Sequence, residues 1–214
     1  MKQYIEKYKE EILKTGLLST DDIITKVVDV STIRAYRDNK IYQPLSMYKV
    51  WAQDSLIKVD EKKQLIFKEN DFEKIHCYFS EDLQNFWKKN DGTELDKIYK
   101  VYKIVDLFFK GITLWEELNK KRREFFFENV HSPLDQYSMK LLKNYSDSLK
   151  KEIPNNVSMS LIQNDKEKYI RFQEEIKRIS NEFNITSYIF DEIAWRVGHI
   201  ETKKEGEYKL IKKI

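Results

Sequence analysis

Apolar residues recur every three or four positions along most of the chain, which is the spacing of an amphipathic helix. The clearest runs lie at residues 2–15, 71–87 and 165–182. Two helix-start signals reinforce this pattern: Ser19 opens a Ser-Thr-Asp-Asp sequence ahead of one apolar run, and Pro44 opens another. The pattern therefore predicts a mainly α-helical protein with seven or more helices.

Residues 56–67 have a different pattern, in which two short apolar runs flank a charged four-residue connector. This arrangement predicts one small β-hairpin. The Asn-Asp-Gly-Thr sequence at residues 90–93 is the clearest turn signal in the chain. We therefore expect a two-lobed helical domain, with an N-terminal lobe at residues 1–90, a second lobe at residues 91–198 and a basic tail at residues 199–214.

The second lobe is expected to consist of helices joined by short connections. A helix from about Glu94 is interrupted at residues 108–113, and the next helix runs to about Phe127. Another helix starts near Pro133, and the last helix ends at Gly198, because glycine is the commonest residue just after a helix.

The composition supports the helical prediction. The 214 residues include only 5 Gly and 3 Pro, fewer than the turns of an all-β sandwich or the glycine-rich loops of a nucleotide-binding α/β fold require. Hydrophobic residues make up 41% of the chain, which is enough for a packed core. The net charge of +3 neither requires nor excludes nucleic acid.

The cysteine content and the apolar runs bear on localisation. The single cysteine, Cys77, cannot form an intrachain disulfide or hold an iron–sulfur cluster by itself. The first residues lack the apolar stretch of a signal peptide, and no apolar run approaches the roughly 20 residues that span a bilayer. We expect a cytoplasmic protein with no membrane partner.

Common catalytic and metal-binding motifs do not occur in the sequence. It has no glycine-rich phosphate loop, no His-Glu-x-x-His motif and no Gly-x-Ser-x-Gly motif. The three histidines are scattered, and each is interpreted as structural or exposed rather than as a ligand. No metal or cofactor is therefore expected.

Residues 109–113 stand between two predicted helices and read Phe-Lys-Gly-Ile-Thr. This sequence is similar to the helix-hairpin-helix turn, whose pattern is apolar-x-Gly-apolar-Gly, with Thr113 at the second glycine. The backbone N–H groups and the helix N-terminus of such a turn can bind a DNA phosphate without reading the bases. Gly111 and Thr113 are therefore candidate DNA-binding residues.

Two downstream segments extend the similarity. The helix with Lys121 and Phe125 is followed by Pro133-Leu134-Asp135, and the chain later reads Ile-Phe-Asp-Glu-Ile-Ala-Trp at residues 189–195. Over roughly residues 94–198 the chain resembles the helix-hairpin-helix DNA glycosylase-like superfamily.

This resemblance implies a DNA-binding protein that excises a damaged or modified base. Asp135 would stabilise the positive charge that develops on the sugar, and Lys121, or its neighbour Lys120, would supply an amine for Schiff-base chemistry. The resemblance further implies phosphate contacts by a set of basic residues: Lys110, Arg122, Arg123 and Lys140.

A second interpretation needs no catalysis. Pro133 followed by Asp135 is also an ordinary helix start, where an acidic residue is favoured by the helix dipole. The basic run at residues 120–123 is also consistent with a solvated helix face. The alternative function is a non-catalytic helical module that binds nucleic acid or a protein partner.

Overall fold

The computed structural model describes residues 1–28, 32, 36, 44–59, 71–91, 95 and 97–211. Most of these residues are helical, which confirms the mainly α prediction. The elements are α1 (Lys2–Leu13), α2 (Thr20–Thr25), α4 (Pro44–Val59), α5 (Phe72–Asp91), α6 (Ile98–Ile112), α7 (Lys120–Asn129), α8 (Gln136–Tyr145), a short 3-10 helix (Met159–Ile162), α9 (Lys166–Glu182) and α10 (Ser187–Ile211).

The chain divides into two compact units. Unit 1 contains Met1–Thr15, Ser132–Leu161 and Ile170–Ile214, so it draws residues from both ends of the chain. Unit 2 contains Gly16–His131 and Ile162–Tyr169. The lobe boundary expected near residue 90 falls within unit 2.

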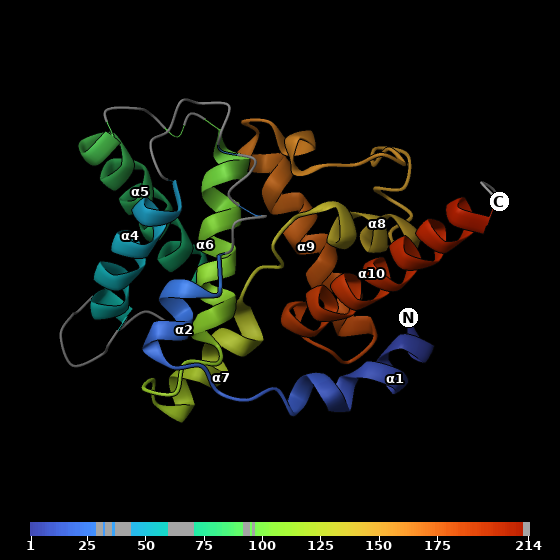
Figure 1. Ribbon diagram of the computed structural model, residues 1–214, viewed down its shortest axis with the longest axis horizontal. Helices are drawn as coiled ribbons and strands as arrows, with labels where there is room; N and C mark the ends of the chain where they lie inside the picture. The colour runs from blue at the N-terminus through green and yellow to red at the C-terminus, as the bar shows by residue number, and fades with distance from the viewer. Residues whose placement is uncertain are drawn as a thin grey trace. The chain divides into compact units, whose positions relative to one another are not determined.

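Unit 2 is built around an aromatic core. Helices α4, α5 and α6 lie side by side, and α2 and α7 pack against this group (Figure 1). Trp51 contacts Phe108 at 5.0 Å between ring centroids, and Phe109 lies 5.1 Å from Phe79 and 5.3 Å from Phe126. These five side chains are fully buried, and burial of such large rings contributes to the stability of this unit.

The interruption expected at residues 108–113 is wrong, because α6 continues to Ile112. Gly111 lies inside the helix, and a Cβ there would stand 2.7 Å from Cγ2 of Val27 and 3.1 Å from Cδ1 of Ile23. The glycine therefore allows close packing of α2 on α6 and does not stop the helix.

The connection between α6 and α7 is an ordered turn at residues 113–119. Leu18 donates its N–H to the carbonyl of Leu114 at 2.7 Å and accepts from the N–H of Glu116 at 2.9 Å. Asn119 then caps α7, since its Oδ1 accepts the N–H of Arg122 at 2.9 Å. The helix expected from residue 114 consequently begins at Lys120.

The β-hairpin expected at residues 56–67 is not shown. Residues 56–59 form the last turn of α4, and residues 60–67 lie outside the described part of the chain. Leu56 and Val59 are buried with Ala52, so their spacing follows the buried face of a helix. A run of four residues is too short for its apolar spacing to distinguish a helix from a strand.

Unit 1 contains α1, α8 and α10, with α10 in contact with both of the others (Figure 1). The helix end expected at Gly198 is wrong, because this residue lies inside α10. A Cβ at Gly198 would stand 2.1 Å from Cδ1 of Tyr137, so the glycine accommodates this ring from α8. No helix among the described residues is long and apolar enough to cross a membrane.

Candidate functional site

Asp135 forms the N-terminal cap of α8. Its Oδ1 accepts the backbone N–H groups of Tyr137 at 2.8 Å and Ser138 at 3.0 Å. The Ser138 hydroxyl oxygen in turn accepts the N–H of Asp135 at 2.9 Å, which completes a capping box. The carboxylate therefore has a fixed orientation at the positive end of the helix dipole.

The segment before Asp135 is anchored by buried polar contacts within unit 1. The backbone N–H of Ser132 donates to Oε1 of Gln173 at 3.1 Å, and the Ser132 carbonyl accepts from Nε2 of Gln173 at 2.8 Å. The Ser132 hydroxyl also donates to Oδ1 of Asp191 at 3.0 Å, and the Ser138 hydroxyl is 2.9 Å from the Pro133 carbonyl. These contacts fix the backbone that leads into the cap.

Two of the expected DNA-binding residues are buried in unit 2. Gly111 packs against α2, and Thr113 is 5% exposed. The Thr113 N–H donates to the Phe109 carbonyl, and its hydroxyl donates to the Lys110 carbonyl at 2.7 Å. This pair therefore does not present N–H groups at the surface, in contrast to the expectation from the sequence.

The two arginines of α7 contact the protein itself. Arg122 is buried, and its guanidinium lies 5.4 Å from the ring centre of Phe125. Arg123 donates through Nη1 to the carbonyl oxygens of three turn residues: Trp115, Glu116 and Leu118. Arg123 thus stabilises the α6–α7 turn and Arg122 packs on aromatic rings of its own helix, whereas the sequence suggested phosphate contacts for both.

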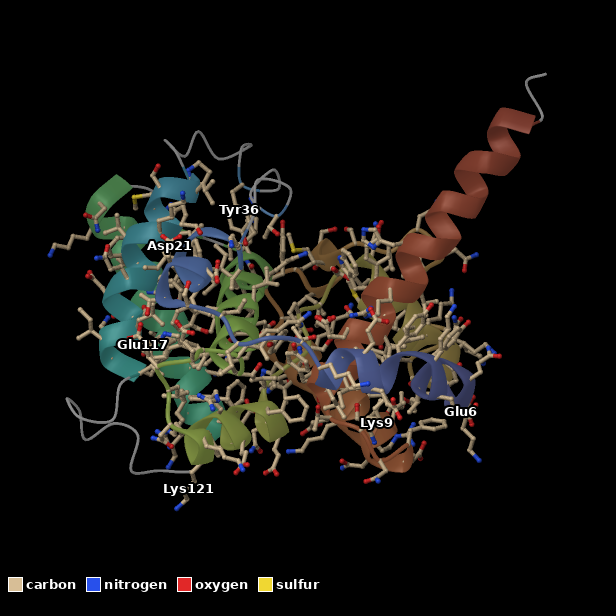
Figure 2. The ribbon with its side chains drawn as sticks, turned by 60° about the horizontal axis from the view of Figure 1, so that its bottom comes forward. Glu6, Lys9, Asp21, Tyr36, Glu117 and Lys121 are labelled. Atoms are coloured by element: carbon tan, nitrogen blue, oxygen red, sulfur yellow. The ribbon has the colours of Figure 1, made fainter. Side chains whose placement is uncertain are left out.

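The expected lysines lie at or near the surface. Lys121 is exposed on the first turn of α7, and its side chain extends away from the helix (Figure 2). Lys140 is exposed on α8, and Lys110 is half-buried at the end of α6. Asp135 belongs to unit 1 and Lys121 to unit 2.

A buried polar cluster in unit 2 was not predicted from the sequence. It consists of His76 on α5, Asp106 on α6, His131 after α7 and Tyr169 on the first turn of α9. Oδ1 of Asp106 lies 2.9 Å from Nε2 of His76 and accepts the Tyr169 hydroxyl at 2.7 Å. Nδ1 of His131 lies 3.0 Å from the same hydroxyl. The three histidines are scattered in the sequence, but the fold brings His76 and His131 together in this cluster, where both are buried and hydrogen-bonded.

Burial controls the electrostatics of this cluster. Desolvation lowers the pKa of His76, although the hydrogen bond to Asp106 opposes this effect. Desolvation, together with the charge of Asp106, raises the pKa of the Tyr169 hydroxyl well above its usual value. Burial also raises the pKa of Tyr102, which makes an edge-to-face contact with the His76 ring, to about 12. Neutral imidazole and neutral phenol are therefore favoured beside a buried carboxyl group.

A signal for the cluster was present in the helix patterns. His76 lies between Phe72 and Phe79 on the apolar face of α5, at spacings of four and three residues. Asp106 likewise lies among the apolar residues of α6. A polar residue on an apolar helix face requires a buried hydrogen-bond partner. The sequence could therefore have suggested that His76 and Asp106 are partners.

No protein-family model matches the chain, and neither a curated protein nor a solved structure matches it.

Proposed function

We propose that the protein binds DNA and removes a damaged or modified base by hydrolysis of its N-glycosidic bond. The observation that carries this proposal is the position of Asp135, a carboxylate that two backbone N–H groups hold in a fixed orientation at the start of α8. Asp135 is also the residue to which the resemblance over roughly residues 94–198 assigns the catalytic role.

The reaction explains why a fixed carboxylate would be useful. As the bond between C1′ and the base nitrogen breaks, positive charge develops on the sugar ring. Water then adds to C1′, and the released base acquires a proton. A preorganised anion stabilises such charge without the cost of reorienting at the moment of reaction. The buried contacts of Ser132 support this role because they limit movement of the Asp135 backbone.

The DNA contacts are assigned to exposed lysines. Lys121 at the start of α7 and Lys140 on α8 are exposed and so accessible to phosphate groups. We assign the helix-hairpin-helix-like element to α6, the turn at residues 113–119 and α7. In this assignment, Arg123 supports the turn through its three carbonyl contacts, while Lys121 contacts DNA.

The capping geometry also favours a second candidate function. Oδ1 of Asp135 and the Ser138 hydroxyl together form a complete capping box, which is sufficient to account for an aspartate at this position. In that case the chain is a non-catalytic module that uses the same exposed lysines to bind nucleic acid.

A panel of duplexes tests the proposal. Each duplex carries one altered base, such as uracil, hypoxanthine, an oxidised guanine or an alkylated purine. We expect alkali-sensitive strand breaks at one class of lesion.

If Lys121 acts as a nucleophile, borohydride will trap a covalent adduct with the parent chain and with the Lys140→Gln variant, but not with Lys121→Gln. Binding to DNA without base release from any duplex would favour the non-catalytic module, and failure to bind any duplex would contradict both functions.

A further inference from the structure

We propose that His76, Asp106, His131 and Tyr169 form a binding site for a divalent transition-metal ion, and zinc fits this set best. The site lies wholly within unit 2. It does not depend on the proposed reaction at Asp135.

The spacing of the donor atoms fits a single ion. The Tyr169 hydroxyl lies 2.7 Å from Oδ1 of Asp106, 3.0 Å from Nδ1 of His131 and 3.5 Å from Nε2 of His76. Oδ1 of Asp106 lies 2.9 Å from Nε2 of His76 and 3.9 Å from Nδ1 of His131. Ligands at the usual Zn–N and Zn–O bond lengths in a tetrahedron are about 3.3 Å apart. The measured separations lie on both sides of this value, so small side-chain shifts would complete the tetrahedron.

The chemistry of the donors selects the class of metal. Two imidazole nitrogens, a carboxylate and a phenolic oxygen suit zinc and neighbouring transition metals, whereas calcium and magnesium prefer oxygen ligands only. All four residues are buried, with His131 the most exposed at 7%. Four protein ligands without access for water are typical of a structural rather than a catalytic zinc site.

Glu73 orients one of the ligands. Its Oε1 lies 2.7 Å from Nε2 of His131, on the side of the ring away from the cluster. If this nitrogen carries the proton, the lone pair of Nδ1 faces the other donors. Metal-bound histidines usually donate their second ring N–H to a carboxylate or carbonyl in this way. Glu73 is therefore a positioning residue for His131.

Asp106 supplies an independent indication of a cation-binding site. Its side chain is 1% exposed, and Oδ2 has no hydrogen-bond partner among the described residues. A buried carboxylate oxygen without a partner is costly, because it loses its hydration and gains nothing in return. A divalent ion bound to Asp106 would compensate the charge. Tyr169 would then bind the ion as a phenolate, with its proton released to solvent, and His76 would bind through the lone pair of Nε2, with its ring proton on Nδ1.

Metal binding to the full-length protein tests this inference. The purified chain is freed of metal with a chelator, then titrated with Zn²⁺ and, separately, with Co²⁺, whose visible absorption reports tetrahedral coordination. We expect one equivalent to bind, with a higher Tm in the presence of Zn²⁺. His199→Ala, which alters the histidine outside the cluster, should bind as the parent does.

Three variants separate the metal site from a hydrogen-bonded network. Asp106→Asn and Tyr169→Phe are close in shape to the parent residues and should weaken Zn²⁺ binding at least tenfold. Glu73→Gln changes a residue whose side chain is 64% exposed, so it should fold normally and weaken binding about 10- to 100-fold. Absence of Zn²⁺ and Co²⁺ binding by the folded parent would overturn the proposal. Parent-like affinity in the folded Glu73→Gln and Tyr169→Phe variants would also overturn it, since the bound ion would then lie elsewhere.

Discussion

Single residues in this protein have contacts that the sequence pattern only partly reveals. The Pro133–Asp135 segment predicted a helix start, and the structure places Asp135 in a capping box with Ser138. The partners that fix this segment, Gln173 and Asp191, lie about 40 and 60 residues further along the chain. Local signals therefore identify the cap, but they cannot identify contacts made by distant residues.

The cap allows charge and hydrogen bonding at Asp135 to be separated. Asparagine and serine cap helices about as well as aspartate, whereas alanine cannot accept the two N–H groups. Asp135→Ala should therefore lower the free energy of unfolding by ~1 kcal/mol, and Asp135→Asn should change it much less. Urea denaturation of both variants measures the difference. Equal losses in the two variants would mean that the negative charge, rather than the hydrogen bonds, stabilises α8.

Glu175 makes the stability of unit 1 depend on pH. Its hydrogen bonds with Arg178, and then with Ser146, lower its pKa from 4.5 to about 2. A group whose pKa is lowered by folding stabilises the native state above its unfolded pKa, and the stabilisation is lost as the pH falls toward the folded pKa. The parent should therefore lose stability between about pH 4.5 and about pH 2.

A glutamine variant isolates this effect. Glu175→Gln should lose less stability than the parent between the two pH values, since it has no carboxylate to protonate. The neighbouring exposed residue supplies the control, and Glu174→Gln should follow the parent curve. Urea midpoints measured across this range test the assignment, which fails if the Glu175→Gln curve has the parent's slope.

At the scale of elements, the starts of helices were predicted better than their ends. Ser19 and Pro44 begin helices as expected, because both signals act through the local backbone. Gly111 and Gly198 were interpreted as breaks, yet both lie inside helices. Each glycine accommodates a side chain from another helix, and the sequence of the helix itself contains no information on that neighbour.

The close approach at Gly198 gives a direct test. An added Cβ would overlap the Tyr137 ring, so Gly198→Ala should destabilise the protein by roughly 1–3 kcal/mol, as overpacked cores do. Gly16→Ala is the matched control, because nothing lies within 4 Å of a Cβ there. Thermal or urea denaturation compares the two. A neutral Gly198→Ala would show that Tyr137 moves aside without cost.

For the whole molecule, the helical class was predictable but the grouping of helices was not. Composition and periodicity indicated a mainly α protein. The membership of α1 in unit 1 depends on contacts with residues near the other end of the chain, including the ion pair of Glu11 with Arg196 at 2.6 Å. Neither a turn signal nor a charge pattern near residue 15 reports such a partner.

The basic residues likewise required the structure for their interpretation. In the sequence, Lys121, Arg122 and Arg123 belong to one basic run. In the structure, Arg122 is buried and Arg123 contacts the α6–α7 turn, so only Lys121 of these three is exposed. The proposed DNA contacts therefore depend on fewer cationic residues than the sequence suggested, and each phosphate contact should contribute roughly 0.9 to the log–log salt slope.

The most direct test of the proposed function is base release by Asp135→Asn under single-turnover conditions. Free base is quantified after incubation of excess protein with the lesion duplex on which the parent acts, and the thermal stability of the same preparations is measured. The proposal predicts that Asp135→Asn keeps nearly the parent Tm, because asparagine preserves the cap, but releases base at a rate lower by orders of magnitude. Base release at the parent rate by a stably folded Asp135→Asn would contradict the catalytic role of Asp135.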